Sequence, residues 1–401
     1  MKGPIFLMLN NLRTILAEVS NFPKRQMPVI SEYIQFLTLR TKRHSFKGAG
    51  EASGLHESRF CSLLNEPETL DLSLKILNRA TRRRLKKLKP VDGRYTIIID
   101  ATIKGRRGKK VENIRKYHSG NSFVTGHKFI NFIILTPSGP IPLASVPAHT
   151  HQYCRDNNID YRTENEIVED LVFQFQESGI LSKTQLKKAV FLLDSGYDTK
   201  KIQQAIREIG SNFVSALKSN RTIQGKQVRE YFCDKRRWLP WKPIRLQIGN
   251  GGKKSRRKYS IRTATQVNLK GFGSVTVVCS KALSRARKPT KYLAASDPKM
   301  TGRQIVEWYS RRWAIELWHK EIKQHYGFGD CHSARFSAIA AHVNFTLTAY
   351  LLQKETGREQ MGIEKYILFK ELKEIKKDLS QFGSITRIKN RVYQVIQDIA
   401  A

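Results

Sequence analysis

The chain has 401 residues and carries 72 lysines and arginines against 34 aspartates and glutamates, a formal charge of +38. Its 40% hydrophobic and 9% aromatic content excludes a disordered chain, and its length allows two or three folded domains. Because a compact protein repels itself at such a charge, the composition favours a polyanionic partner, nucleic acid above all. The basic residues cluster, and no long apolar span accompanies them, which argues against a membrane partner. The basic clusters are Arg82–Lys87, Lys104–Lys110, Lys235–Arg237 and Lys253–Lys258.

The first residues and the cysteines indicate where the protein resides. Met1–Leu9 contains too short an apolar run for a signal peptide and no small-residue cleavage site. The five cysteines are scattered without paired spacing, which is typical of reduced thiols and argues against a zinc knuckle. We therefore expect a cytoplasmic protein.

Residues 1–90 are predicted to form a helical DNA-binding domain. Residues 46–64 look like a helix-turn-helix, in which Gly54 takes the left-handed turn conformation between two short helices. The second helix would direct Arg59 outward, where a recognition helix enters a major groove. An ordinary helical hairpin has the same pattern, and the sequence leaves that alternative open.

Residues 91–218 are predicted to form the first part of an α/β catalytic domain. Two short apolar runs, Tyr95–Asp100 and Ala189–Asp194, each end in an acid and are typical of buried strands. Antiparallel strands followed by β–α alternation predict a mixed sheet flanked by helices, an order that matches a ribonuclease-H-like fold. The other elements expected here are strands at Lys128–Thr136, Pro140–Pro147 and Asn212–Leu217 and helices at about Thr163–Glu177 and Thr199–Ile209.

Residues 219–297 are predicted to be a β-rich insertion in the catalytic domain. Short strands such as Tyr259–Asn268 and Ser274–Cys279 alternate there with turns rich in glycine and lysine. Trp238 and Trp241 lie in a basic part of this segment. They are expected either to stack on a base flipped out of the DNA or to pack in the core.

Residues 298–355 are predicted to complete the catalytic domain, and residues 356–401 to form a helical C-terminal segment. A helix should begin after the capping box of Thr301 and Gln304 and run to about Tyr326, where Gly327 ends it. Its several tryptophans, Trp313 among them, predict that the helix is mostly packed. At 3.6 residues per turn, one stripe of this helix carries Tyr309, Arg312, Glu316 and Lys323.

Three acids are candidates for phosphodiester chemistry. Asp100 and Asp194 end strands that would meet at one edge of the sheet, and Glu316 comes from the helical stripe. Carboxylates bind hard cations such as Mg²⁺, and two such ions activate the nucleophile and stabilise the leaving oxygen. A solvated helix face with pairs four residues apart is the alternative for the stripe. Asp198 is interpreted as the cap of the following helix.

The stripe also resembles a known signature. The spacing Y-x2-R-x3-E-x6-K is similar to that of a large class of bacterial and archaeal DDE insertion-sequence transposases, and it favours Arg312 over Arg311 and Lys323 over Lys320. Ile-Ile-Ile-Asp100-Ala-Thr resembles the first motif of this class, and Leu-Leu-Asp194-Ser-Gly-Tyr-Asp resembles the second. The resemblance covers roughly residues 90–350.

The resemblance implies a ribonuclease-H-like core that binds the inverted repeats at transposon ends, cleaves one strand and joins the end to target DNA. It implies two Mg²⁺ ions, with Mn²⁺ as a substitute, on Asp100, Asp194 and Glu316. By the same resemblance, Tyr309, Arg312 and Lys323 contact DNA phosphates. It also implies a homodimer on double-stranded DNA in a prokaryotic nucleoid.

Two other functions fit part of this pattern. A metal-dependent DNA nuclease on the same fold would share the three acids but would need neither the stripe nor the insertion. A non-catalytic DNA-binding protein derived from a transposase would be expected to have lost an acid.

Overall fold

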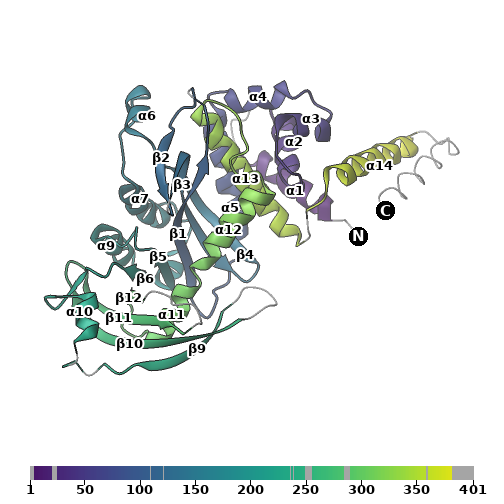
Figure 1. Ribbon diagram of the computed structural model, residues 1–401. Helices are drawn as coiled ribbons and strands as arrows, with labels where there is room; N and C mark the ends of the chain where they lie inside the picture. Colours follow the sequence, from purple (N-terminus) through teal and green to yellow (C-terminus); the bar gives the residue numbers. More distant parts are fainter. Residues whose placement is uncertain are drawn as a thin grey trace. The chain divides into compact units, whose positions relative to one another are not determined.

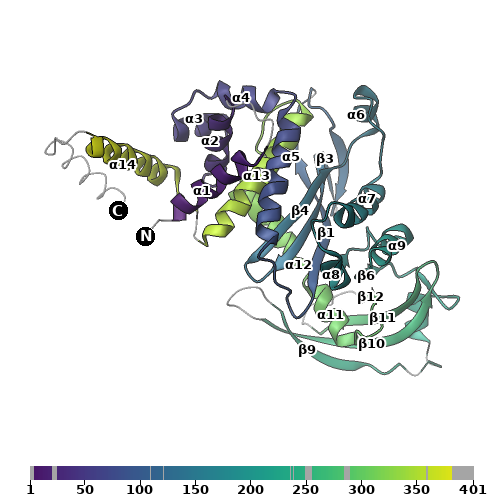
Figure 2. The same cartoon turned by 180° about the vertical axis from the view of Figure 1, so that it is seen from behind.

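The computed structural model describes residues 4–19, 25–108, 110–120, 122–234, 236–237, 239–248, 255–283, 290–357 and 360–381. The chain divides into two compact units, whose elements are labelled in Figures 1 and 2. The helical unit comprises Met1–Thr81, Lys110–Glu112 and Lys320–Ala401, and the sheet unit comprises Arg82–Lys109 and Asn113–His319. None of the helices in the described ranges has the length and apolar character needed to span a bilayer.

The helical unit is organised around α13, which contacts α1, α2 and α4. Its residues are buried almost all round, as expected for a helix enclosed by others. The helical segment predicted at residues 356–401 is present in part as α14, and its last part, beyond residue 381, lies outside the described residues. The helices of this unit are α1 (Pro4–Ala17), α2 (Met27–Leu37), α3 (Phe46–Ser53), α4 (Ser58–Asn65), most of α5 (Thr69–Leu85), α13 (Phe336–Thr356) and α14 (Ile363–Gln381).

The two short helices predicted around Gly54 are present as α3 and α4. Ser45 caps α3 by accepting a hydrogen bond from the Gly48 amide, and Gly54 ends it with φ +77°. Phe60 is fully buried between the helices, while Arg59 is exposed on α4. The geometry is that of a helical hairpin with a polar outer face.

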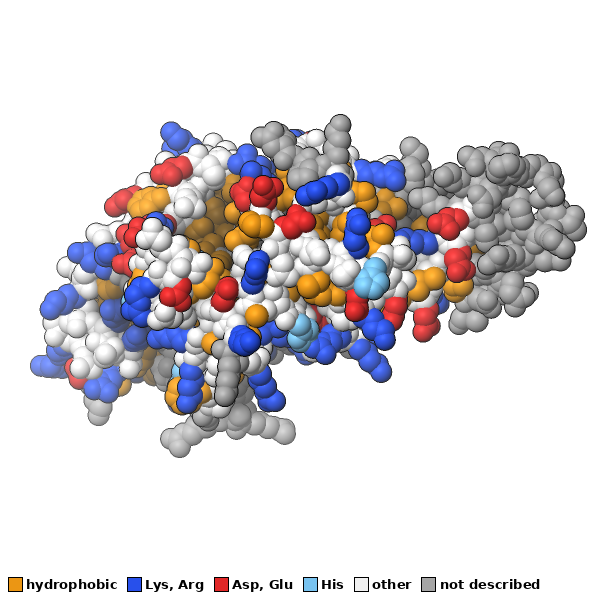
Figure 3. Space-filling model, turned by 90° about the horizontal axis from the view of Figure 1, so that it is seen from above, with side chains coloured by type: hydrophobic (Ala, Val, Ile, Leu, Met, Phe, Trp, Pro, Cys, Tyr) orange, Lys and Arg blue, Asp and Glu red, His pale blue; other side chains and the backbone are white. Residues whose placement is uncertain are grey.

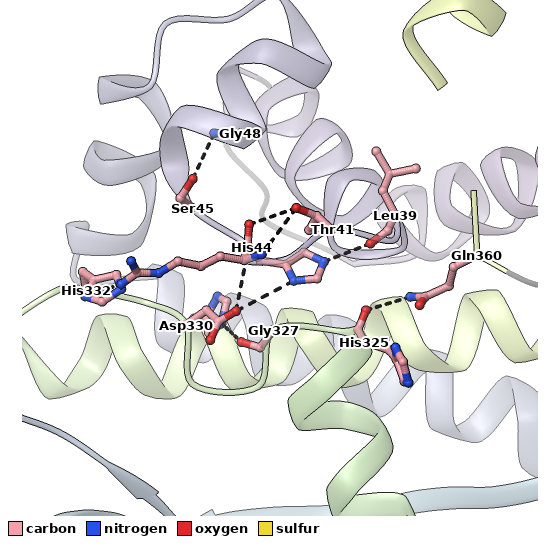
Figure 4. Close-up of polar contacts among 12 residues, drawn as sticks. Leu39, Thr41, His44, Ser45, Gly48, His325, Gly327, Asp330, His332 and Gln360 are labelled. Carbon is pink, nitrogen blue, oxygen red and sulfur yellow. Dashed lines mark hydrogen bonds and ion pairs between the residues drawn. The ribbon is translucent and has the colours of Figure 1, made fainter. Parts of the chain in front are cut away.

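A loop after α12 (Trp313–His325) is held against the segment that precedes α3 (Figure 4). The His44 amide donates to Asp330 Oδ2 at 3.2 Å, and the buried His44 ring lies 3.1 Å from the Leu39 carbonyl oxygen through Nε2. Gly327 has φ +71°, and a Cβ on it would lie 2.7 Å from the His44 ring. Glycine is therefore required there by backbone conformation and by space.

The sheet unit is built on one mixed sheet of twelve strands in the described chain. Along the sheet the strands follow the order β2-β3-β1-β5-β6-β12-β11-β10-β7-β8, with β4 on β3 and β9 on β10. β1 is parallel to β5, β5 is parallel to β6, and β3 is antiparallel to β1. The first strands are β1 (Tyr95–Gly105), β2 (Arg115–Ser119), β3 (Ser122–Thr136), β4 (Gly139–Pro147), β5 (Ala189–Leu193) and β6 (Asn212–Leu217).

The segment predicted as a β-rich insertion continues this sheet. Its strand β12 pairs antiparallel with β6, so its strands extend the sheet that begins with β1. β10 and β11 are longer than the strands expected from the sequence because they pair along nearly their whole lengths. The strands are β7 (Thr222–Ile223), β8 (Lys226–Gln227), β9 (Lys242–Ile248), β10 (Ser255–Leu269), β11 (Gly273–Ala282) and β12 (Lys291–Ala295), with α10 (Val228–Cys233) between β8 and β9.

Helices flank the sheet, as the sequence predicts. α7 and α9 contact each other and lie side by side in Figure 1. The predicted capping box of Thr301 and Gln304 begins α11, which packs against β6, β11 and β12. The helices are α6 (His151–Asp156), α7 (Glu164–Glu177), α8 (Lys183–Lys187), α9 (Lys200–Glu208) and α11 (Gly302–Ser310).

The single helix predicted from Thr301 to about Tyr326 is wrong, since α11 ends at Ser310 and α12 begins at Trp313. Across the junction the hydrogen bonds join residues three apart: the amide of Arg312 donates to Tyr309, and that of Ile315 donates to Arg312. These tighter turns replace the α-helical pattern. They also leave Trp313 58% exposed, against the prediction that the tryptophans here are packed.

Asp198 is not the cap of α9, contrary to the sequence interpretation. Thr199 caps the helix by accepting from the Ile202 amide. The Asp198 carboxylate is fully buried and accepts hydrogen bonds from three side chains, which explains why it is drawn inward. They are Gln203 Nε2 at 2.6 Å, Ser215 Oγ at 3.1 Å and Arg221 Nε at 3.0 Å.

Asp198→Ala is expected to lower the free energy of unfolding by about 3–5 kcal/mol, because Arg221 loses its charge partner and two buried donors lose their acceptor. Asp170→Ala is a matched control. Asp170 pairs with Arg162 at 2.5 Å on the surface, with both side chains more than 40% exposed, so its loss should cost about 0–1 kcal/mol. Urea unfolding followed by circular dichroism measures both. Equal losses in the two variants would contradict this account.

Figure 3 shows how the basic residues are displayed on one face of the molecule. Lys and Arg side chains are spread over much of this face, with fewer acidic side chains among them. This distribution fits the composition, in which basic residues outnumber acidic ones by 72 to 34.

Candidate active site

Asp100 and Asp194 lie beside each other because β1 and β5 are parallel and in register. Ile99 pairs with Leu193, so the next residue on each strand is one of the two acids. β1 does not end at Asp100 as predicted. It runs to Gly105 because it pairs with β3 along its whole second half. Asp100 therefore lies where the parallel pairing stops, and Asp194 follows the last residue of β5.

The junction of α11 and α12 brings three further side chains to these acids. The Tyr309 hydroxyl donates to Asp194 Oδ1 at 3.4 Å. Arg312 donates to Asp100 Oδ2 at 3.2 Å and also to Glu316. The structure thus brings together five of the predicted site residues, from two strands and two helices of the sheet unit.

Arg312 is the electrostatic centre of this group. Its side chain is 12% exposed, and it forms ion pairs with both Asp100 and Glu316. Burial alone would lower the pKa of the guanidinium, but Tyr309 and the three surrounding carboxylates hold it above its usual range. Arg312 therefore stays charged and offsets the negative charge of the acids.

The pKa of Asp100 departs from its ordinary value. Burial raises its pKa to about 6, although Arg312 and a hydrogen bond from the Ala101 amide act in the opposite direction. The negative charges of Asp194 and Glu316 raise it further. The negative charges of the other two acids thus act on Asp100, a pattern that is common at functional sites.

The donor set fits a hard divalent cation in its chemistry, because all three side chains offer carboxylate oxygens. Within the described residues, however, no three His, Cys, Asp or Glu side chains lie close enough together to hold an ion. The guanidinium of Arg312 lies between two of the acids instead. Binding a cation would require Arg312 to release at least one carboxylate.

Sequence reasoning missed Tyr197, which is part of the same site. Its side chain is buried and hydrogen-bonded to Glu164, which in turn pairs with Lys128 Nζ at 2.6 Å. Burial holds the pKa of Tyr197 well above its usual range, and Glu164, Asp100 and Asp194 raise it further. Tyr197 belongs to the motif after Asp194, and its place in that motif was the available signal.

A pocket of about 240 Å³ adjoins the acids on the side of β10, β11 and β12. Tyr309 and Arg312 line it together with Trp313. Its walls combine apolar and cationic side chains, and residues from the insertion segment contribute both kinds. Those residues include Leu293, Tyr259, Arg257 and Lys291.

The other predicted DNA contacts lie apart from this group in the chain. Trp241 is 41% exposed, and the Arg262 guanidinium lies 4.6 Å from its ring centroid. Trp238 lies outside the described residues. Lys323 is partly buried later in α12, in the part that belongs to the helical unit, and Arg59 is exposed on α4 of that unit.

Asp100→Asn is expected to stabilise the metal-free protein at neutral and alkaline pH. The folded-state pKa of Asp100, about 6, lies above its ordinary value of 3.8, so stability present below pH 3.8 is lost as the pH rises through 6. Asparagine cannot ionise and avoids this loss. Unfolding with a chelator present should show the variant more stable than the wild type by about 1–3 kcal/mol at about pH 8, with no difference near pH 4.

Asp160→Asn is the control for the loss of one negative charge, because Asp160 is exposed. The expectation is contradicted if the wild type is more stable than Asp100→Asn at the higher pH. It is also contradicted if the difference in free energy of unfolding between the two proteins does not change with pH.

Part of the chain is similar to a known protein family. Residues 158–352 match the family model described as "Transposase DDE domain", a span that includes Asp194 and Glu316 but not Asp100. No curated protein matches the chain. Among solved structures it is similar to a piggyBac transposase in a cryo-EM synaptic complex with hairpin DNA, at 10% identity over 98% of this chain and 85% of that chain, with a TM-score of 0.48. The family match supports a transposase of the DDE kind.

Proposed function

We propose that the chain is the transposase of a prokaryotic insertion sequence, and that it binds the terminal inverted repeats, cleaves one strand and joins the freed end to target DNA. The observation that carries the proposal is the convergence on Arg312 of acids from β1 and α12, with Asp194 held next to them through Tyr309. Three carboxylates, with a guanidinium among them that can bind a phosphate, form a set suited to phosphodiester chemistry.

The strand order supports a ribonuclease-H-like core. β4, β3 and β1 form an antiparallel series, and β1 continues into the parallel strands β5 and β6. Asp100 and Asp194 come from the two central strands of this arrangement, which is where such a core would place them.

Asp100, Asp194 and Glu316 would hold the divalent cations, two Mg²⁺ or Mn²⁺ ions. Bound there, such cations would lower the pKa of the attacking water and stabilise the leaving oxygen. When the acids turn to a cation, Arg312 loses its carboxylate partners and can pair with a DNA phosphate through two parallel hydrogen bonds. Tyr309, whose pKa is raised to about 12 mainly by burial, stays protonated and can donate to an oxygen.

Further contacts complete the proposed complex with double-stranded DNA. Arg59 on α4 would read the transposon end, and Lys323 would bind a phosphate. Trp241 and Trp238 are proposed to stack on a displaced base, and the cationic and aromatic walls of the pocket beside Arg312 fit the same role. Pairing of two ends would require a homodimer at the nucleoid.

Glu316→Gln is expected to abolish strand cleavage while DNA binding persists, since the amide keeps the shape of the side chain but removes its negative charge. The loss should be at least about a thousandfold. The assay incubates the protein with Mg²⁺ and DNA from the flanks of its gene and resolves the products on a denaturing gel. Glu307→Gln is the matched control, because Glu307 is an exposed acid on α11 that pairs only loosely with Arg311, at 3.9 Å.

Three outcomes would sink the proposal: a wild type that leaves the gene's flanking ends uncut, a Glu316→Gln variant that cuts as well as the wild type, or an equal loss in Glu307→Gln. Cleavage without any joining to target DNA would favour a metal-dependent nuclease instead.

A further inference from the structure

The hairpin of β2 and β3 exposes an aromatic side chain that the site described above does not use. Phe123 is 59% exposed, the largest value for a bulky hydrophobic side chain in the described ranges. It pairs across the hairpin with His118, and their ring centroids lie 5.2 Å apart. Leaving this much aromatic surface in water is unfavourable unless a partner covers it.

A lysine lies over this aromatic ring. Lys116 Nζ lies 4.6 Å from the Phe123 centroid, whereas Arg115 alternates to the opposite face of β2, where its guanidinium lies 5.9 Å from the Tyr117 ring centroid. In the part of the chain that the structure describes, neither cation forms an ion pair. The stretch 113–128 contains no aspartate or glutamate. A partner that covers this surface must therefore tolerate positive charge and offer flat apolar groups.

The strand pairing relates this surface to the candidate active site. Asp100 pairs with Asn131 on β3, and Phe123 precedes Asn131 by eight residues on the same strand. Because side chains alternate along a strand, an even spacing places Phe123 and Asn131 on the same face of the sheet. Eight residues span roughly 26 Å, the length of about eight base pairs of DNA.

We propose that the β2–β3 hairpin is a second DNA-binding surface, on which Phe123 contacts bases while Lys116 neutralises a neighbouring phosphate. Exposed phenylalanines serve this purpose by stacking on bases or wedging between them, and lysine and arginine provide the salt-dependent part of binding. The inference rests on the proposed function, since a duplex held at Asp100 is long enough to reach the hairpin.

The test measures anisotropy of a fluorescein-labelled duplex of mixed sequence, about three helical turns long, over a series of salt concentrations. Phe123→Ala should weaken binding on the order of tenfold with an unchanged salt dependence, because the ring carries no charge. Lys116→Met should lower the slope of log K against log salt by about 0.9, the value for one phosphate contact. Phe123→Trp should restore the affinity, because it keeps an aromatic face.

Ile159→Ala is the matched control, because Ile159 is 42% exposed but lies between asparagine and aspartate. The inference is overturned if Phe123→Ala binds like the wild type, if Ile159→Ala weakens binding equally, or if Phe123→Ala changes only the oligomeric state, which would indicate a protein partner. A wild type with no affinity for the duplex would instead refute the proposed function itself.

Discussion

Repulsion among three carboxylates is the constraint on which the candidate site depends. Burial raises the pKa of Asp100, and the negative charges of Asp194 and Glu316 raise it further. In the absence of a cation such an arrangement is unfavourable unless a positive group lies within it. The guanidinium of Arg312 is that group, and it is held by two of the acids that it stabilises.

The break between α11 and α12 places Arg312 at the junction of the two helices. In a continuous α-helix Arg312 and Glu316 would lie on one regular stripe. At the junction the turns are tighter, and Arg312 forms ion pairs with both Asp100 and Glu316. α11 packs against β6, β11 and β12, and two of these strands come from the segment predicted as an insertion. That segment therefore forms part of the surface on which α11 packs.

Much of this arrangement is predictable from the sequence, for identifiable reasons. Short apolar runs predicted β1 and β5, and the capping box of Thr301 and Gln304 predicted the start of α11, because these signals are local. The extension of β1 beyond Asp100 was missed because it depends on pairing with β3. The helix break was missed because no glycine or proline marks residues 310–313, where it occurs.

The exposed Trp313 shows the same dependence on contacts between elements that are distant in the sequence. Periodicity predicts which residues share a face of a helix, but not whether another element covers that face. Trp313 lies on the same helix as the buried Trp318 and is nevertheless exposed, in the wall of the pocket beside Arg312. The site was predictable as a set of residue types, and its electrostatics were not.

Asp194 and Asp198 show how burial and hydrogen bonding assign different roles to two acids in one motif. The Asp198 carboxylate is fully buried and already accepts from Gln203, Ser215 and Arg221, so it has little capacity left for a ligand. Asp194 is partly exposed and receives only a long hydrogen bond of 3.4 Å from Tyr309. A carboxylate must keep free lone pairs to bind a cation. This difference favours Asp194 over Asp198 as the ligand in the proposed site, and it explains why the two residues cannot exchange roles although only three residues separate them.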